Sequence, residues 1–152
     1  MKICLVSSSG GHLSQLKELI KVVKDKDYFI VTEKNLVNLP LKKSHRAYFL
    51  NQQERKSAKF LFDFITNLLK AFFILIKERP QLIITTGAGA VIPLAILGKL
   101  MGAKLVFIES FAKIDSPTIT GRILYKFADR FYIQWEELRK HYPDAIYRGT
   151  IY

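Results

Sequence analysis

The stretch Leu5-Val-Ser-Ser-Ser-Gly-Gly-His-Leu13, close to the start of the chain, decides the fold. The apolar run Ile3–Val6 ends in three serines and two glycines, and a helical pattern begins at His12. This order predicts a strand, a glycine loop and a helix. The first N–H groups of a helix have no partner within the helix, so such a loop is suited to hold a phosphate or another negatively charged oxygen.

The same alternation continues along the rest of the chain. Apolar runs predict strands at Ile3–Val6, Tyr28–Thr32, Ala47–Leu50, Leu82–Thr86, Leu105–Ile108, Phe131–Gln134 and Ile146–Tyr147, with a loop containing Pro40 before the third. Helical spacing predicts helices from His12, over Ser57–Lys77, Ala90–Met101 and Ile119–Phe127, and a short one from Trp135. Strands that alternate with helices indicate an α/β fold with a doubly wound, mainly parallel sheet. We expect a single domain over residues 1–152.

The composition limits the classes of function that the chain can have. The chain has 24 Lys and Arg against 13 Asp and Glu, a net charge of +11, which implies an anionic partner: nucleic acid, an acidic membrane surface or a phosphorylated substrate. Its one cysteine, Cys4, excludes an internal disulfide and fits a reducing compartment. The three histidines, His12, His45 and His141, are scattered, so no metal site is expected. No signal peptide or membrane-spanning stretch is predicted, which favours a cytosolic location.

The predicted topology brings distant residues to one crevice. In a doubly wound sheet of order 3-2-1-4-5, the first and fourth strands are neighbours, and the loops after them diverge at the carboxyl edge. Three groups of residues should meet there. They are Ser9, Gly10, Gly11 and His12 after the first strand, Gly87 and Gly89 after the fourth, and Glu109 and Ser110 after the fifth.

The roles of these residues have alternatives. A neutral His12 at a helix N-terminus could accept a proton from a sugar hydroxyl or contact substrate, or it could only cap or pack the helix. Glu109 could act as a base, or it could cap the next helix or pair with Lys113. The glycines could admit a ligand, or they could only turn the chain and admit the following helix.

The segment Ser57–Lys77 is unusually apolar for a surface helix. Its apolar residues form one broad face, and Lys56, Lys59, Lys70 and Lys77 flank it. This face could simply pack on the sheet. Alternatively, part of it could rest on anionic lipid.

The sequence also leaves two other functions open. A self-sufficient nucleotide- or dinucleotide-binding enzyme could use the Gly10-Gly11 loop, and Glu33 stands where an acidic residue would hold a ribose. The glycines, however, do not spell GxGxxG. A nucleic-acid-binding module is motivated only by charge, because the basic residues are spread along the chain without a recognised motif.

Three stretches taken together resemble a known family: SSSGGHLSQL, TTGAGAVIPLAILGKLMGAKLVFIES and SPTITGRILYKFADRFYIQWEELRKHYPDAIYRG. They are similar to the acceptor-side subunit of two-part UDP-sugar glycosyltransferases. In eukaryotes that subunit anchors the UDP-N-acetylglucosamine transferase of lipid-linked oligosaccharide synthesis, and similar bacterial chains belong to capsular and exopolysaccharide assembly. The first two stretches also resemble the N-terminal half of the peptidoglycan N-acetylglucosaminyltransferase.

The resemblance implies a Rossmann-like domain equivalent to the N-terminal half of a GT-B glycosyltransferase, with the enzyme divided over two chains. This chain would bind a lipid pyrophosphate-linked saccharide acceptor, and a partner subunit would bind the UDP-sugar donor. No cofactor of its own and no nucleic acid are expected. The eukaryotic subunit has an N-terminal membrane helix, whereas this sequence begins with a strand. Membrane attachment is therefore expected from the protein surface or the partner, with the subunit peripheral on the cytoplasmic face of the cell membrane.

The resemblance also assigns residues. His12 or Glu109 would assist deprotonation of the acceptor hydroxyl, as parts of a hexosyltransferase that needs its partner chain. The residues that match the family's acceptor side are Ser9, Gly10, Gly11, His12, Gly87, Gly89 and Ser110.

Overall fold

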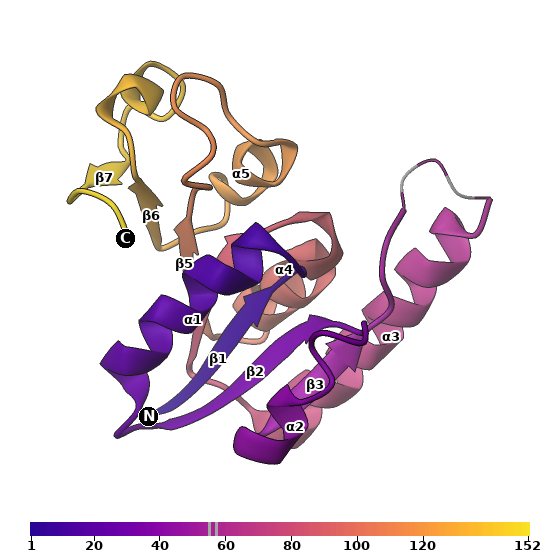
Figure 1. Cartoon of the computed structure of the whole chain (residues 1–152). Coiled ribbons are helices and arrows are strands. Elements are labelled where there is room, and N and C mark those ends of the chain that lie inside the picture. Colours follow the sequence, from indigo (N-terminus) through magenta and orange to yellow (C-terminus); the bar gives the residue numbers. More distant parts are fainter. Residues whose placement is uncertain (55, 57) are drawn as a thin grey trace.

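The structure is a computed structural model that describes residues 1–54, 56 and 58–152 (Figure 1). The strands are β1 (Lys2–Ser7), β2 (Asp27–Glu33), β3 (Ala47–Leu50), β4 (Leu82–Gly87), β5 (Lys104–Ile108), β6 (Arg130–Ile133) and β7 (Ile146–Tyr147). The α-helices are α1 (Gly11–Val23), α2 (Leu41–Ser44), α3 (Phe60–Glu78), α4 (Ile92–Leu100) and α5 (Ile119–Leu124). Two 3-10 helices, η1 (Gly89–Val91) and η2 (Glu136–Lys140), complete the described elements.

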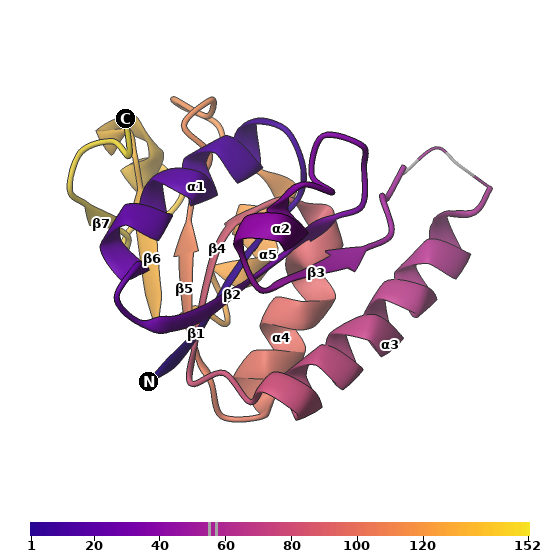
Figure 2. The ribbon, with the colours of Figure 1, turned by 60° about the horizontal axis from the view of Figure 1, so that its bottom comes forward.

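The strands form one parallel sheet in the order β3-β2-β1-β4-β5-β6-β7. The predicted fold class and the predicted order of the first five strands are therefore confirmed. Helix α1 covers one face, and α3 and α4 cover the other (Figures 1 and 2). Alternation along β1 explains the two layers, because Cys4 and Val6 join the core under α3 and α4, while Ile3 and Leu5 join the core under α1.

The local differences from the sequence prediction are small and have local causes. The segment predicted as a loop around Pro40 contains the one-turn helix α2, which begins directly after this proline. The fixed φ of proline is compatible with a helix start, so the residue begins a turn of helix here. The helix predicted over Ala90–Met101 is divided into η1 and α4. The short helix predicted from Trp135 is the 3-10 helix η2.

Helix α3 packs with an unexpected face. The predicted helix starts at residue 57, which lies outside the described residues, and the described helix begins at Phe60. Its buried residues are Asn67, Ala71, Ile74, Leu75 and Glu78. Most of its large apolar side chains are exposed: Leu61, Phe62, Phe64, Ile65, Leu69, Phe72, Phe73 and Ile76. The broad apolar face therefore does not pack on the sheet.

Figures 1 and 2 show the N-terminal end of α3 projecting away from the sheet. The exposed apolar side chains thus belong to a helix that is only partly covered by the rest of the protein. Among the described residues, no helix has both the length and the apolar character needed to span a bilayer.

Candidate functional site

The loops after β1 and β4 are clasped together at the carboxyl edge of the sheet. The backbone N–H of Ser8 donates to the carbonyl oxygen of Gly87 at 2.7 Å. The hydroxyl oxygen of Ser8 accepts from the N–H of Ala88 at 3.0 Å. The structure therefore brings the two glycine turns together where the chain was predicted to form a crevice.

His12 is fixed by a reciprocal pair of hydrogen bonds to β4. Its Nδ1 lies 2.6 Å from the carbonyl oxygen of Thr86, and the Thr86 hydroxyl donates to the carbonyl oxygen of His12 at 2.7 Å. A carbonyl oxygen only accepts, so Nδ1 carries a hydrogen, and in the neutral form of the ring the lone pair is on Nε2. Gly87, with φ +93°, leaves space for this ring: a Cβ there would lie 3.3 Å from ring atoms of His12.

The glycine loop leaves the start of α1 open. Gly10 has φ +74° and precedes the helix, and a Cβ added at Gly10 or Gly11 would have no neighbour within 4 Å. Helix α1 has no side-chain cap and no acidic residue in its first turn. The N–H groups of that turn, together with the positive end of the helix dipole, can therefore hold a negatively charged oxygen.

A cavity of about 370 Å³ lies beside this loop. It is lined by Ser8, Glu33, Gln53, Ala88, Gly89 and Ala90. The side-chain Nε2 of Gln53 is buried and has no hydrogen-bond partner within the described ranges, so it is able to donate to a ligand in this cavity. Ser8 and Gln53 were not predicted from the sequence; no pattern distinguishes Gln53 from its neighbour Gln52 in the segment after β3.

The Glu33 carboxylate holds the loops in place. Its Oε2 accepts from the N–H of Ser9 at 2.9 Å and from the Ser9 hydroxyl at 3.0 Å, and its Oε1 accepts from the N–H of Gln53 at 3.2 Å. Ser9 therefore supports the glycine loop through Glu33. Because these contacts occupy the carboxylate, the geometry does not support the ribose-binding role that a dinucleotide enzyme would require.

The environment of Glu109 differs from the one predicted for a catalytic base. It is fully buried, and its oxygens accept from the N–H of Ser110 at 2.8 Å, from the N–H and hydroxyl of Thr118, and from the Tyr142 hydroxyl at 2.7 Å. Burial, followed by the charge of Glu109, raises the pKa of Tyr142, which keeps the phenol protonated as a donor. Thr118 is the N-cap of α5. The geometry therefore supports the capping alternative, and it does not support Glu109 as a base.

Ser110 also lies in a supporting position. It is buried, and its hydroxyl oxygen accepts from the N–H of Ala112 at 3.3 Å in the turn that follows β5. Glutamines missed by the sequence analysis join this turn to α1. Gln134 Nε2 donates to Gln15 Oε1 at 2.7 Å and to the carbonyl oxygen of Glu109 at 2.8 Å. The helix that begins at the glycine loop is thereby braced against the segment after β5.

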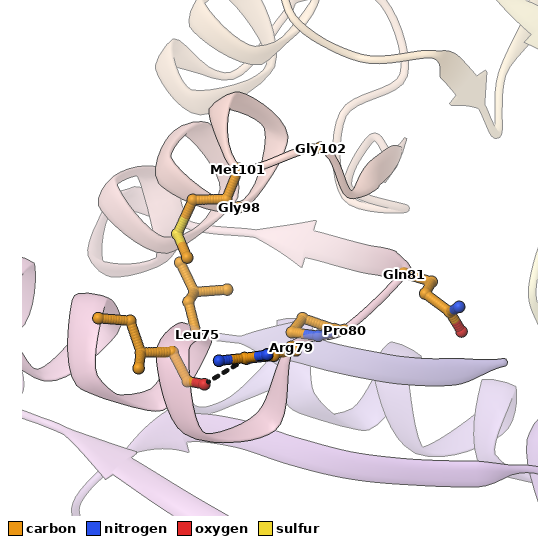
Figure 3. Close-up of a pocket in the computed structure, with 8 residues that line it drawn as sticks. Leu75, Arg79, Pro80, Gln81, Gly98, Met101 and Gly102 are labelled. Atoms are coloured by element: carbon orange, nitrogen blue, oxygen red, sulfur yellow. Dashed lines mark hydrogen bonds between the residues drawn. The ribbon is translucent and has the colours of Figure 1, made fainter.

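A larger cavity of about 500 Å³ lies at the opposite, amino edge of the sheet (Figure 3). Leu75, Ile76 and Arg79 from the end of α3 line it, together with Pro80, Gln81, Gly98, Met101 and Gly102. It contains none of the predicted site residues. In the part of the chain that the structure describes, no group of three or more His, Cys, Asp and Glu could hold a metal ion.

Residues 39–151 match the family described as "Oligosaccharide biosynthesis protein Alg14 like". The chain belongs to the Alg14-like family. A rat protein (Rattus norvegicus) named UDP-N-acetylglucosamine transferase subunit ALG14 is 23% identical over 177 residues, which cover 98% of this chain and 82% of that protein. The Schizosaccharomyces pombe protein of the same name is 29% identical over 167 residues, covering 94% and 80%. The resemblance found in the sequence is thus confirmed.

Solved structures show the same fold. Acinetobacter baumannii MurG superposes with a TM-score of 0.73 at 14% identity, covering 90% of this chain and 43% of that one. UDP-N-acetylglucosamine 2-epimerase from Rickettsia bellii superposes with a TM-score of 0.77 at 15% identity, covering 99% and 45%. The Alg14-like chain therefore has the Rossmann-like fold of the N-terminal half of a GT-B enzyme, and it spans less than half of each of these structures.

Proposed function

We propose that this Alg14-like chain is the acceptor-binding and activating subunit of a two-component, membrane-associated UDP-sugar glycosyltransferase that acts on a lipid-linked saccharide. The observation that carries the proposal is the clasp of the two glycine turns around His12, at the switch point of an Alg14-like sheet. The names of the relatives favour N-acetylglucosamine as the transferred sugar. The bacterial chains that the sequence resembles favour surface polysaccharide, capsular or exopolysaccharide, as the product.

The division of labour follows from the size of the fold. A GT-B enzyme uses two facing Rossmann-like domains, and this chain corresponds to less than half of MurG. In our proposal a partner subunit faces the carboxyl edge and holds the UDP-sugar. This chain then holds the acceptor between the start of α1 and the loop after β4.

The geometry of His12 suits proton transfer from the acceptor. The acceptor hydroxyl oxygen forms a bond to the anomeric carbon of the donor, the bond from that carbon to the phosphate oxygen breaks, and UDP leaves with the electron pair. Nε2 of His12 takes the hydroxyl proton, because Nδ1 is occupied by the Thr86 carbonyl oxygen. The open N–H groups at Gly10 and Gly11 hold a phosphate oxygen of the acceptor.

Helix α3 supports the proposed contact with the membrane. Phe62 and Phe73 on this helix are 68% and 67% exposed, and the exposed Lys77 lines a cavity together with Phe73. Apolar side chains flanked by lysines are typical of helices that lie on an anionic bilayer. The net charge of +11 favours the same surface. We place this surface on the cytoplasmic side of the cell membrane.

The proposal is tested by reconstitution. The chain is purified alone and together with the product of a neighbouring gene, and transfer of sugar from UDP-N-acetylglucosamine to a lipid pyrophosphate acceptor is measured. We expect transfer only from the pair. In the pair, His12→Asn should lower kcat about 10²–10⁴-fold, the usual contribution of a general base. The matched control His141→Asn alters an exposed histidine elsewhere and should retain activity. Full activity from this chain alone would overturn the two-component proposal.

A further inference from the structure

A strongly basic cavity lies at the edge of the sheet, away from the glycine turns. Its volume is about 650 Å³, and its lining brings together Lys34, Lys42, His45, Arg46 and Lys70 with the ring of Phe49. These side chains come from three separate parts of the chain: the segment after β2, the region from α2 to edge strand β3, and α3. No carboxylate contributes to the described lining of this cavity.

Most of this positive charge is uncompensated. Of the basic residues that line the cavity, only Arg46 forms ion pairs within the described part of the chain, with Asp27 at 2.5 Å and with Glu78 at 3.6 Å. Lys42 lies 5.7 Å from the centre of the Phe49 ring, and Lys70 Nζ donates to the amide oxygen of Asn51. Neither of these lysines, nor Lys34, makes an ion pair with a carboxylate of the described residues.

The lysines are close enough to disfavour one another's charge. Partial burial, followed by the charge of Lys34, lowers the pKa of Lys70, and Asp63 opposes this shift. An anion in the cavity would relieve the repulsion. Lysines on an edge strand often serve only to prevent strand pairing between molecules. These lysines instead lie on flanking segments and converge on a hollow, which indicates a ligand.

We propose that this cavity binds a phosphate-bearing anion. A phosphate group carries enough negative charge and enough acceptor oxygens to meet several lysines at once, whereas a single carboxylate would leave most of them unpaired. The phosphate is either that of a soluble polyphosphate or the headgroup of an anionic phospholipid. A neighbouring cavity of about 330 Å³ shares Tyr48, Phe49 and Lys70 and reaches Phe73 on the exposed face of α3.

The test uses the intact chain and two ligands. Binding of inorganic pyrophosphate is measured by titration calorimetry, and binding to vesicles of phosphatidylcholine, with and without phosphatidylglycerol, is measured by sedimentation. The pocket variant is Lys34→Glu with Lys42→Glu, two exposed lysines. The control is Lys24→Glu with Lys126→Glu, which changes the net charge equally at exposed sites outside the cavity. Circular dichroism checks the fold, and Lys42→Gln serves as a milder variant.

We expect the pocket variant to lose at least about tenfold in affinity for pyrophosphate, for anionic vesicles or for both, since a lost contact to a charged group has about this effect. The control should bind as the unchanged protein does. Loss for pyrophosphate identifies a soluble ligand, and loss for anionic vesicles alone identifies a headgroup. Equal losses in both variants, or no binding of either ligand by the unchanged protein, would overturn the proposal. None of these lysines lines the cleft around His12, so the outcome is independent of the sugar-transfer test.

Discussion

Gly10 and Gly11 are adjacent in the first loop, but glycine is needed at these two positions for different physical reasons. Gly10 adopts φ +74°, a conformation that other L-residues rarely take, so the turn itself explains it. Gly11 has no such φ, and a Cβ there would meet open space. Nothing in the folded chain requires glycine at position 11. The proposed ligand at the start of α1 would require glycine there, because a methyl group at position 11 would lie beside the open N–H groups and obstruct the ligand.

Substitution Gly11→Ala therefore separates folding from function. Alanine has the higher helix propensity, by up to about 1 kcal/mol, so the thermal unfolding temperature should stay unchanged or rise. Sugar transfer by the complex with the partner subunit should fall at least about tenfold, as expected when a phosphate contact is obstructed. Val22→Ala, near the far end of α1 and 78% exposed, is the control and should leave sugar transfer unchanged. Unchanged activity in Gly11→Ala would mean that the loop only turns the chain.

The sequence could place Glu109 at the edge of the sheet but could not assign its role. In a sequence, an acidic residue after a buried strand gives the same pattern whether its side chain faces a ligand or other parts of the protein. The difference lies in Thr118 and Tyr142, which donate to it from later in the chain and which no spacing rule connects to it. His12 was easier to interpret, because a residue that begins a helix after a glycine loop can be positioned from sequence alone.

At the scale of elements, the strands were predictable and the orientation of α3 was not. Central parallel strands are buried on both faces, so a continuous apolar run such as Ile3–Val6 marks β1 almost completely. Helix α3 has one broad apolar face, but it packs with a different face, which carries the buried Asn67 and Glu78. Its orientation is set by the buried Asn67, which accepts from the N–H of Asn51 at 2.6 Å and donates to the Asn51 carbonyl oxygen at 2.9 Å.

Substitutions on the exposed face of α3 should weaken membrane binding without changing the stability of the fold. Leu61 and Phe62 are 67% and 68% exposed, so the double change to Gln should leave the free energy of unfolding within about 0.5 kcal/mol. Binding to anionic vesicles should weaken by about tenfold or more, because each large apolar side chain gains about 1.5–3 kcal/mol on full burial. The control changes Val22 and Leu36, 78% and 87% exposed, to Gln. Equal vesicle binding by both variants would exclude α3 as the contact.

For the whole molecule, the two edges of the sheet are built differently. The carboxyl edge has open N–H groups and turns of glycine. At the amino edge, buried or partly buried carboxylates join separate elements. Glu78 at the end of α3 accepts from Lys2 of β1 at 3.1 Å and from the Tyr48 hydroxyl of β3. Asp129 accepts from Lys99 of α4 at 2.6 Å and from the N–H of Leu105 of β5 at 2.7 Å.

These two carboxylates predict how stability depends on pH. Burial alone would raise the pKa of Glu78, but hydrogen bonds from Tyr48 and Lys2 and the charge of Arg46 hold it below its ordinary value of 4.5. Burial likewise acts against Asp129, but Lys99 and the Leu105 N–H hold its pKa below 3.8. Both groups are more acidic in the folded chain. Their stabilisation is therefore complete above these ordinary values. It is lost as the pH falls from these values through the lower pKa values of the folded chain, because the unfolded chain takes up protons first.

The double variant Glu78→Gln with Asp129→Asn should then be less stable at pH 7, by about 2–4 kcal/mol, because hydrogen bonds to charged groups are lost. Its unfolding free energy should change less than that of the unchanged protein between about pH 6 and pH 3. Urea unfolding at a series of pH values measures both effects. The control Asp25→Asn with Glu137→Gln removes two exposed carboxylates and should retain the original slope. If the double variant kept that slope, other carboxylates would have to hold the amino edge together.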